Sequence, residues 1–294
     1  MKIGFLSTAE KPDMMPYDLQ AKEMLKESNV DVEIIFWENY NEDNAHQLAA
    51  YDLVVMRTCW NYYKNIPEFL KFLDLLEQSG ANMYNPVNLI KWNIDKKYLL
   101  ELQSEGFGII PTLFVFDDEE GTFEKAVAKG WKQIVLKPMI SAGSYNTFVI
   151  DADDAERFME LKNKYFINRP YLLQEFLPEI ALGEVSTLHF ADGYGYSVTK
   201  VPKAGDYRVQ FQYGGVYHIE EVNPEIEKIS ARISEKLGHS TLYRRLDGIW
   251  RNDRFLIMEL ELIEPDLYLN LSSEALNHWV ENLVSLVKNP VTQA

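Results

Sequence analysis

Short apolar runs alternate with segments of helical hydrophobic spacing in the N-terminal third of the chain. This pattern predicts the following elements: strands at residues 2–7, 31–37 and 51–57, helices at residues 18–27, 66–78 and 94–104, and a short strand with a turn at residues 82–86. Strands that alternate with helices of this length are typical of an open parallel sheet covered on both faces. No Gly-x-Gly-x-x-Gly follows the first strand, which gives a dinucleotide site there little support.

The spacing changes after Pro111 and changes again after Gly183. The middle part predicts a compact α+β unit with strands at residues 112–116, 134–137, 145–150 and 171–176 and helices at residues 122–129 and 153–164. The last part predicts mostly consecutive strands, at residues 184–190, 194–201, 206–212, 216–221, 246–251 and 254–263, with helices at residues 224–236 and 274–286. Tyr213-Gly-Gly-Val216 is a hairpin signal between two of these strands. We therefore expect three domains, at residues 1–92, 93–177 and 178–294.

The strand at residues 255–263 has an unusual distribution of charge. Read with a period of two, one face is wholly apolar, with Leu256, Met258, Leu260 and Leu262. The other face carries Glu259 and Glu261, flanked by Phe255 and Ile257. Two carboxylates side by side on a buried strand repel each other unless a cation compensates them, and Mg²⁺, often accompanied by phosphates, suits oxygen ligands. The alternative is a solvated strand face, where acidic residues are common.

Composition narrows the classes of function. The 294 residues are 47% hydrophobic, enough for two or three packed units. A net charge of −16 without a basic stripe argues against nucleic-acid binding and against an anionic membrane surface. The chain has no apolar run long enough for a membrane span and begins directly with a strand, so we expect a cytoplasmic protein. The single cysteine, Cys59, excludes an internal disulfide and a thiolate zinc cage.

Several basic and acidic residues stand where a nucleotide could be bound, although each is ambiguous by itself. Lys137 ends an apolar strand and is followed by the small-residue loop Ser141 to Ser144, which is either an anion-binding loop or an ordinary turn. Lys96 lies near a helix start and is equally consistent with a solvated helix face. Further polar residues near predicted strand ends either bind a nucleotide or lie on the surface. They are Gln174, Glu175, Glu184, Arg208, Arg245 and Asp247.

Taken together, the order and spacing of these residues resemble the ATP-grasp superfamily. Among its members, the chain is similar to RimK-type glutamate ligases, prokaryotic glutathione synthetases and D-alanine–D-alanine ligases. The similarity is carried by Val201-Pro-Lys-Ala-Gly-Asp-Tyr-Arg208 with Tyr213-Gly-Gly215, and by Asn85-Pro, Asp95-Lys96 and Pro111. Arg57-Thr-Cys-Trp-Asn-Tyr62 and Glu259-Leu-Glu-Leu-Ile-Glu-Pro-Asp-Leu-Tyr268 resemble the branch that contains the cycloserine-forming ligase. The resemblance implies an ATP-grasp fold: a parallel-sheet N-terminal (pre-ATP-grasp) domain, a small α+β lid and an antiparallel-sheet C-terminal domain.

The resemblance also implies roles for individual residues. Lys96 and Lys137 would bind the nucleotide phosphates, and the loop with Ser141, Gly143 and Ser144 would be a mobile flap over them. The segment Gln174, Glu175, Phe176 and Leu177 would read adenine, with Glu184 on the ribose. Asp247, Glu259 and Glu261 match the metal-ligand positions for Mg²⁺, with two ions expected and Mn²⁺ as a substitute. Glu261 departs from the asparagine usual in the family, and the extra carboxylate would either tighten Mg²⁺ binding or alter the balance between the two ions.

The implied reaction joins a small-molecule carboxylate to an amine, or closes a ring within one molecule, through an acyl phosphate made from ATP. Lys137, Arg208 and Arg245 would neutralise the transferring oxygens and the reacting acyl group. Arg57 is at the C-terminal end of a predicted strand and is a candidate to bind a substrate carboxylate. A homodimer is a further expectation. The alternatives are a small-molecule kinase of the same architecture and a non-catalytic nucleotide-binding scaffold.

Overall fold

The N-terminal strands form the parallel sheet that their alternation with helices predicts. The computed structural model describes residues 1–117, 119–238 and 241–289. Four strands pair in the order β2-β1-β3-β4, all parallel: β1 (Lys2–Ser7), β2 (Asp31–Phe36), β3 (Leu53–Thr58) and β4 (Met83–Tyr84). Alternate residues of β1 enter different cores, Phe5 on the side of α1 (Pro16–Glu27) and Leu6 on the side of α2 (Ile66–Gln78). The prediction that both faces are covered is confirmed.

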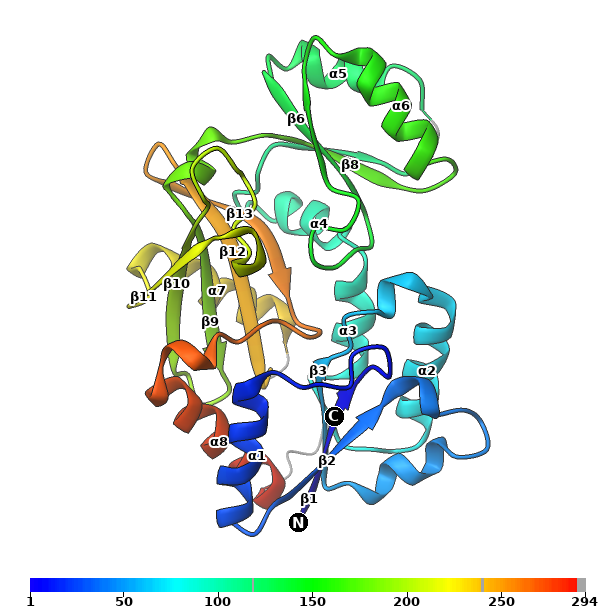
Figure 1. Cartoon of the computed structure of the whole chain (residues 1–294), viewed down its shortest axis with the longest axis vertical. Coiled ribbons are helices and arrows are strands. Elements are labelled where there is room, and N and C mark those ends of the chain that lie inside the picture. The colour runs from blue at the N-terminus through cyan, green and yellow to red at the C-terminus, as the bar shows by residue number, and fades with distance from the viewer. Residues whose placement is uncertain (118, 239–240, 290–294) are drawn as a thin grey trace.

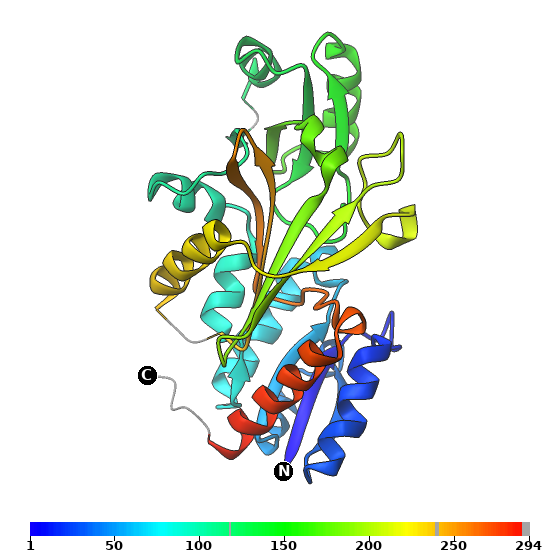
Figure 2. The same cartoon turned by 90° about the vertical axis from the view of Figure 1, so that its left-hand side faces the viewer.

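The C-terminal helix returns to this sheet. Helix α8 (Ser273–Lys288) packs beside α1, as two perpendicular views show (Figures 1 and 2). Trp279 of α8 is fully buried in the same core as Phe5 of β1 and Leu188 of β9. The last helix therefore ties the N-terminal sheet to the C-terminal one.

Five antiparallel strands make up the C-terminal sheet, in the order β11-β10-β9-β12-β13. They are β9 (Glu184–Phe190), β10 (Gly195–Val201), β11 (Val216–Glu220), β12 (Tyr243–Arg251) and β13 (Arg254–Glu261). Helix α7 (Pro224–Leu237) covers one face with Ile226 and Ile233. The other face looks toward the lid and the N-terminal domain.

The predicted strand at residues 206–212 is wrong, and so is the hairpin turn at residues 213–216. The segment between β10 and β11 is a loop with one short 3₁₀ turn (Phe211–Tyr213), and β11 pairs with β10 across it. Asp206 accepts hydrogen bonds from the main-chain N–H groups of Tyr207 and Arg208, at 2.8 and 2.9 Å. Such local side-chain hydrogen bonds compete with a strand ladder.

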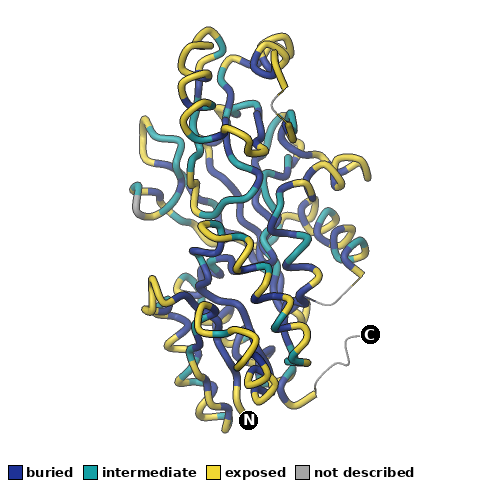
Figure 3. Tube along the Cα trace, turned by 90° about the vertical axis from the view of Figure 1, so that its right-hand side faces the viewer, coloured by how far each residue is buried: buried dark blue, intermediate teal, exposed yellow. Residues whose placement is uncertain are grey.

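A second antiparallel sheet, at the top of Figure 1, belongs to the part of the chain that was predicted to be a lid, and we name it the lid after that prediction. Its strands run in the order β5-β8-β6-β7. They are β5 (Thr112–Val115), β6 (Gln133–Pro138), β7 (Phe148–Asp151) and β8 (Tyr171–Glu175), covered by α5 (Thr122–Ala128) and α6 (Ala155–Tyr165). Figure 3 shows buried chain concentrated in the strands of all three sheets, with exposed residues on loops and outer helix faces.

Two short helices link the N-terminal domain to the lid, where one helix at residues 94–104 was predicted. They are α3 (Val87–Ile94) and α4 (Tyr98–Ser104), and Asp95 between them has extended main-chain angles (φ −100°, ψ 123°). The main-chain N–H of Lys96 donates to the carbonyl of Met139 at 3.0 Å. This break places Lys96 at the end of β6. Within the described residues, no helix has both the length and the apolar character needed to cross a membrane.

Candidate active site

A β-bulge sets which side chains of β13 reach the site. Asp247 pairs with Glu259, whereas the next residue, Gly248, pairs with Ile257, so Met258 is left over. An extra residue switches the alternation of a strand. A Cβ on Gly248 would lie 2.5 Å from the carbonyl oxygen of Leu256, so this close approach requires glycine.

The expectation that Phe255 and Ile257 flank the two glutamates is therefore wrong. Both lie in the core under α7 together with Leu260 and Leu262. Leu256 and Met258, expected on that apolar face, pack instead in a separate cluster with Phe176. The bulge keeps the glutamates on the face toward the lid while the apolar residues on either side of it stay buried.

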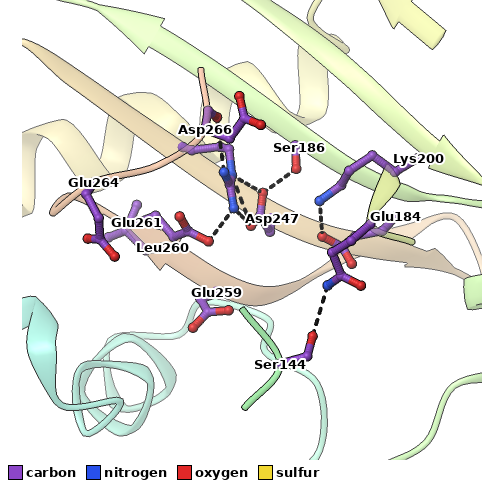
Figure 4. Close-up of polar contacts among 12 residues, drawn as sticks. Ser144, Glu184, Ser186, Lys200, Asp247, Glu259, Leu260, Glu261, Glu264 and Asp266 are labelled. Atoms are coloured by element: carbon purple, nitrogen blue, oxygen red, sulfur yellow. Dashed lines mark hydrogen bonds and ion pairs between the residues drawn. The ribbon is translucent and has the colours of Figure 1, made fainter. Parts of the chain in front are cut away.

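Four charged residues consequently lie on one face of β12 and β13, where Arg245 is paired with Glu261 and Asp247 with Glu259. Arg245 donates two hydrogen bonds to Asp247, from Nε to Oδ1 at 3.0 Å and from Nη2 to Oδ2 at 2.9 Å (Figure 4). It also forms an ion pair with Glu261. Ser186 donates to Asp247 at 2.5 Å, and Glu259 is bound by Lys96 at 2.8 Å.

The balance of charge in this cluster favours an additional cation. Burial raises the pKa of Glu261 well above its usual value, and Asp247, Glu259 and Glu264 raise it further against the opposing effect of Arg245. Burial would also raise the pKa of Asp247, but Arg245 and Lys200 outweigh it and bring the value down to about 2. The local arginine and lysines thus leave part of the negative charge uncompensated.

The donor set is chemically suited to a divalent metal ion. Three carboxylates are the hard oxygen ligands that Mg²⁺ prefers. As the side chains stand, no three acidic, histidine or cysteine residues of the described chain converge tightly enough to hold an ion. Asp247 and Glu261 are turned to Arg245, and Glu259 is turned to Lys96. Metal binding therefore requires Glu259 to exchange its lysine for the ion.

Two buried lysines from the lid side face these carboxylates. Lys137, at the end of β6, is 7% exposed, and the described residues place no ion-pair partner against it. Burial, together with Lys96, lowers the pKa of Lys137 to about 8 against the opposing effects of Glu259 and Glu184. Lys96 donates to the carbonyl and the hydroxyl of Ser141, each at 3.3 Å. The structure thus brings Lys96 and Lys137 together with the acidic residues of β12 and β13.

The loop between β6 and β7, predicted to be a flap, touches both neighbouring domains. Ser144 accepts a hydrogen bond from Gln210 at 2.9 Å, and Tyr145 lies 4.8 Å from Tyr63 between ring centroids. Gly143 has a positive φ of 60°. Two cavities of about 210 and 290 Å³ open on the lid beside Arg169, and neither is lined by the charged residues described above.

The residues predicted to bind adenine and ribose are engaged by other parts of the chain. Gln174 donates to Thr112 at 2.8 Å, and Glu175 is paired with Arg251 at 2.7 Å. Phe176 and Leu177 belong to an apolar cluster at the junction of the lid with the C-terminal sheet. Glu184 is paired at 2.5 Å with Lys200, a buried lysine that sequence reasoning did not single out. The available signal was the position of Lys200 opposite Glu184 in the predicted strand pair.

Two predicted site residues stand apart from the cluster. Arg208 is 40% exposed and paired with Asp206 at 2.8 Å. Arg57 is 1% exposed and paired with Asp18 at 2.9 Å. The Nη1 atom of Arg57 is buried without an acceptor among the described residues. The substrate-binding roles of both arginines stay predictions.

The aromatic residues that follow β3 differ in their surroundings. Tyr62 is buried and stacks on Phe69 of α2, with 5.1 Å between the ring centroids, so it packs against that helix. Tyr63 meets the flap, and the indole N–H of Trp60 donates to the carbonyl oxygen of Glu264 at 3.0 Å. Glu264 is a second buried residue that sequence reasoning missed.

Comparison with known proteins agrees with this arrangement. Residues 103–249 match the family described as prokaryotic glutathione synthetase, ATP-grasp domain, and residues 3–85 match the N-terminal domain of the D-cycloserine synthetase DcsG. The cycloserine biosynthesis protein DcsG of Streptomyces lavendulae is 21% identical over 97% of this chain and 100% of its own length. A glutathione synthetase of Neisseria meningitidis serogroup A is 24% identical over 70% of this chain and 64% of its own length.

Solved structures show the same fold. The crystal structure of D-cycloserine synthetase DcsG superposes with a TM-score of 0.82 at 20% identity, covering 98% of this chain and 100% of that one. A D-alanine–D-alanine ligase from Bacillus anthracis superposes with a TM-score of 0.70 at 15% identity, covering 98% and 96%.

The fold and the charged site thus define an enzyme of the ATP-grasp class, an ATP-dependent carboxylate–amine ligase. The chain belongs to the family of prokaryotic glutathione synthetase ATP-grasp domains, as the resemblance in its sequence predicts. The family binds ATP together with a divalent metal ion.

Proposed function

We propose that the protein activates a small-molecule carboxylate as an acyl phosphate with ATP and Mg²⁺, and then joins it to a nitrogen nucleophile. The products would be an amide, ADP and phosphate. One observation carries the proposal: buried Lys96 and Lys137 face Asp247, Glu259 and Glu261 across the junction of lid and C-terminal sheet. Cations and carboxylates in this arrangement suit a metal-bound polyphosphate.

Lys137 supports the phosphate assignment most directly. Burying a cation without a partner is costly, and a phosphate oxygen would compensate it. Lys96 can serve in the same way, because transfer of Glu259 to a metal ion would release the lysine that it now holds. Asp247, Glu259 and Glu261 would hold the ion, which when bound supplies neutralisation of the phosphate charge.

Arg245 is assigned to the reacting acyl group. Its guanidinium is 7% exposed and held in place by Asp247, Glu261 and the carbonyl of Asp266. A preorganised cation of this kind stabilises negative charge that develops on an acyl oxygen. The reaction needs no protein nucleophile, and burial raises the pKa of Cys59 well above its usual value.

The nucleotide base and sugar are assigned to the junction formed by Gln174 to Leu177 and by Glu184. The side chains of Gln174 and Glu175 are engaged by Thr112 and Arg251, so we assign the main chain of this segment to the adenine edge. Glu184 would exchange its bond with Lys200 for the ribose hydroxyls.

The identity of the substrate follows less directly. A relative that aligns with nearly the whole chain is a cycloserine biosynthesis protein, whereas the family model that matches residues 103–249 is that of glutathione synthetases. Ring closure within one molecule and amide formation between two molecules are therefore both to be tested. Each uses the same acyl phosphate.

The test is a screen of D- and L-amino acids and dipeptides for release of ADP and phosphate, with and without Mg²⁺. An acyl-phosphate intermediate predicts that ¹⁸O from the substrate carboxylate appears in the released phosphate. Lys137→Met should abolish turnover, while Lys125→Met, at an exposed lysine paired with Glu119, should not. ADP without phosphate would indicate a kinase, and release of neither product would indicate a nucleotide-binding scaffold.

A further inference from the structure

Glu264, in the segment that follows β13, is a buried acid that is only 8% exposed. Within the described residues, no cation or side-chain donor lies within bonding distance of its carboxyl group. Its own main-chain N–H donates to the carboxyl group and lowers its pKa. Buried carboxylates are normally paired, and leaving one unpaired is costly.

Other buried acids of the protein show the contrast. Asp18 is paired with Arg57 at 2.9 Å, and Glu184 with Lys200 at 2.5 Å. Figure 4 shows Glu264 beyond Glu261, with no contact drawn to it. Since these acids have partners within the chain and Glu264 has none among the described side chains, we expect its partner to be a ligand.

The surroundings of Glu264 indicate where that partner lies. Arg245, Lys96, Glu259 and Glu261 act on it electrostatically from the charged cluster. In turn, Glu264 raises the pKa of Cys59 and Tyr62, in the segment after β3, and of Tyr243 in β12. Figure 4 shows Glu264 beside Glu261, and its main-chain carbonyl accepts the indole N–H of Trp60. Glu264 therefore lies between the charged cluster of the proposed acyl-transfer site and the aromatic residues that follow β3. A ligand group there would be next to the activated acyl carbon.

We propose that Glu264 binds the nitrogen nucleophile as a primary ammonium group and accepts a proton from it when the nitrogen attacks. The proposal rests on the proposed function and deepens it by defining the chemical class of the second substrate. An ammonium group supplies both the positive charge and the hydrogen-bond donors that a buried carboxylate lacks.

The proposed step balances as follows. The ammonium gives one proton to the Glu264 carboxylate, and its freed lone pair forms the C–N bond with the acyl carbon. The C–O bond to phosphate breaks, and the phosphate leaves with that electron pair. After the C–N bond has formed, the nitrogen loses one further proton to the departing phosphate and keeps the last one as the amide N–H. Glu264 then releases its proton to solvent.

The acidity of Glu264 agrees with this role. Burial raises the pKa of Glu264 to about 8, although Arg245 and Lys96 oppose the effect. A group whose pKa lies near the working pH exchanges protons efficiently.

The experiment compares two nucleophiles in the Glu264→Gln variant, with the acid that gives the highest wild-type turnover in the screen. Hydroxylamine is uncharged at neutral pH and traps acyl phosphates as hydroxamates without a base. We expect the variant to keep hydroxamate formation within about twofold and to lose amide formation by about a hundredfold, the usual contribution of a positioned base. For two separate substrates the amine KM should also rise. Glu274→Gln, at an exposed acid of α8, should leave both products unchanged.

The outcomes separate the two proposals. Wild-type amide formation in Glu264→Gln overturns the role of Glu264, and so does an equal loss of amide and hydroxamate. A wild-type enzyme that forms no hydroxamate with any acid overturns the proposed function instead.

A measurement without substrate tests the unpaired carboxylate itself. Because the folded pKa is raised, ionisation of Glu264 destabilises the fold as pH rises from the usual glutamate range to about 8. Glu264→Gln should therefore melt at a higher temperature than wild type, by a margin that widens over this interval. A margin that stays constant, or a lower melting temperature, shows that the chain itself satisfies Glu264 and overturns the inference.

Discussion

Replacing Glu259 by glutamine gives the sharpest test of the proposed metal site. The substitution keeps the size of the side chain and a carbonyl oxygen that can still accept the bond from Lys96, now at 2.8 Å. It removes one negative charge from the cluster on β12 and β13. The lysine and the fold should therefore stay in place while the affinity for a divalent ion falls.

The structure sets the expected magnitudes. The glutamate side chain of this pair is 27% exposed, so solvent screening limits the cost in stability to about 1 kcal/mol. Loss of one preorganised electrostatic contact in the transition state costs on the order of 3 kcal/mol, or about a hundredfold in rate. The rate should thus fall about a hundredfold, whereas the folding equilibrium should shift by only about fivefold.

The assay measures ADP and phosphate release over a Mg²⁺ titration, together with thermal unfolding of the same samples. Glu160→Gln is the matched control, because Glu160 forms an exposed pair with Arg157 on α6. A folded Glu259→Gln protein with a rate within threefold of wild type at limiting Mg²⁺ would refute the assignment of Glu259 to the metal (about 0.7 kcal/mol).

Three further predictions concern the framework around the site. Asn93→Ala should destabilise the protein by about 2 to 4 kcal/mol in urea unfolding, because it leaves two buried main-chain groups at the end of β13 without partners. A cost below about 1 kcal/mol, which is about fivefold in the folding equilibrium, would contradict this. Arg57→Met should cost about 3 to 5 kcal/mol in the same unfolding measurement by leaving Asp18 buried and unpaired, and adding Asp18→Asn should recover most of the loss. A double variant no more stable than Arg57→Met would contradict this. Burial and Arg244 lower the pKa of His189, so the stability that depends on neutral His189 should be present above about pH 6.5 and fall at lower pH. In His189→Gln, melting temperatures measured over this pH range should lose this part of the acid sensitivity. An unchanged dependence of the melting temperature on pH would contradict this role of His189.

The sequence alone determined the large architecture, for a local reason. Alternation of strands and helices in the first part requires crossover connections, and these produce the parallel sheet that the structure contains. Lys96, Lys137, Asp247 and Glu259 could be selected because their order matches a known pattern. Each is placed by a neighbouring strand or helix whose hydrophobic period is visible in the sequence.

What the sequence could not predict depends on contacts between distant segments. The strand expected at residues 206–212 is lost to the local hydrogen bonds of Asp206, whose side chain competes with the ladder. The helix expected at residues 94–104 is interrupted where Lys96 meets Met139 of another element. In both places one or two polar contacts outweigh a weak local preference for a strand or a helix.

The charged site itself was decided by tertiary structure. Strict alternation predicts the wrong neighbours for Glu259, because the bulge at Met258 depends on how β12 pairs with β13. Nothing local to Glu264 reveals that it is buried and unpaired, since its surroundings come from β12, β13 and the segment after β3. Periodicity fixes which face a residue takes within one element, whereas burial and the partners of a charge depend on the elements that pack against it.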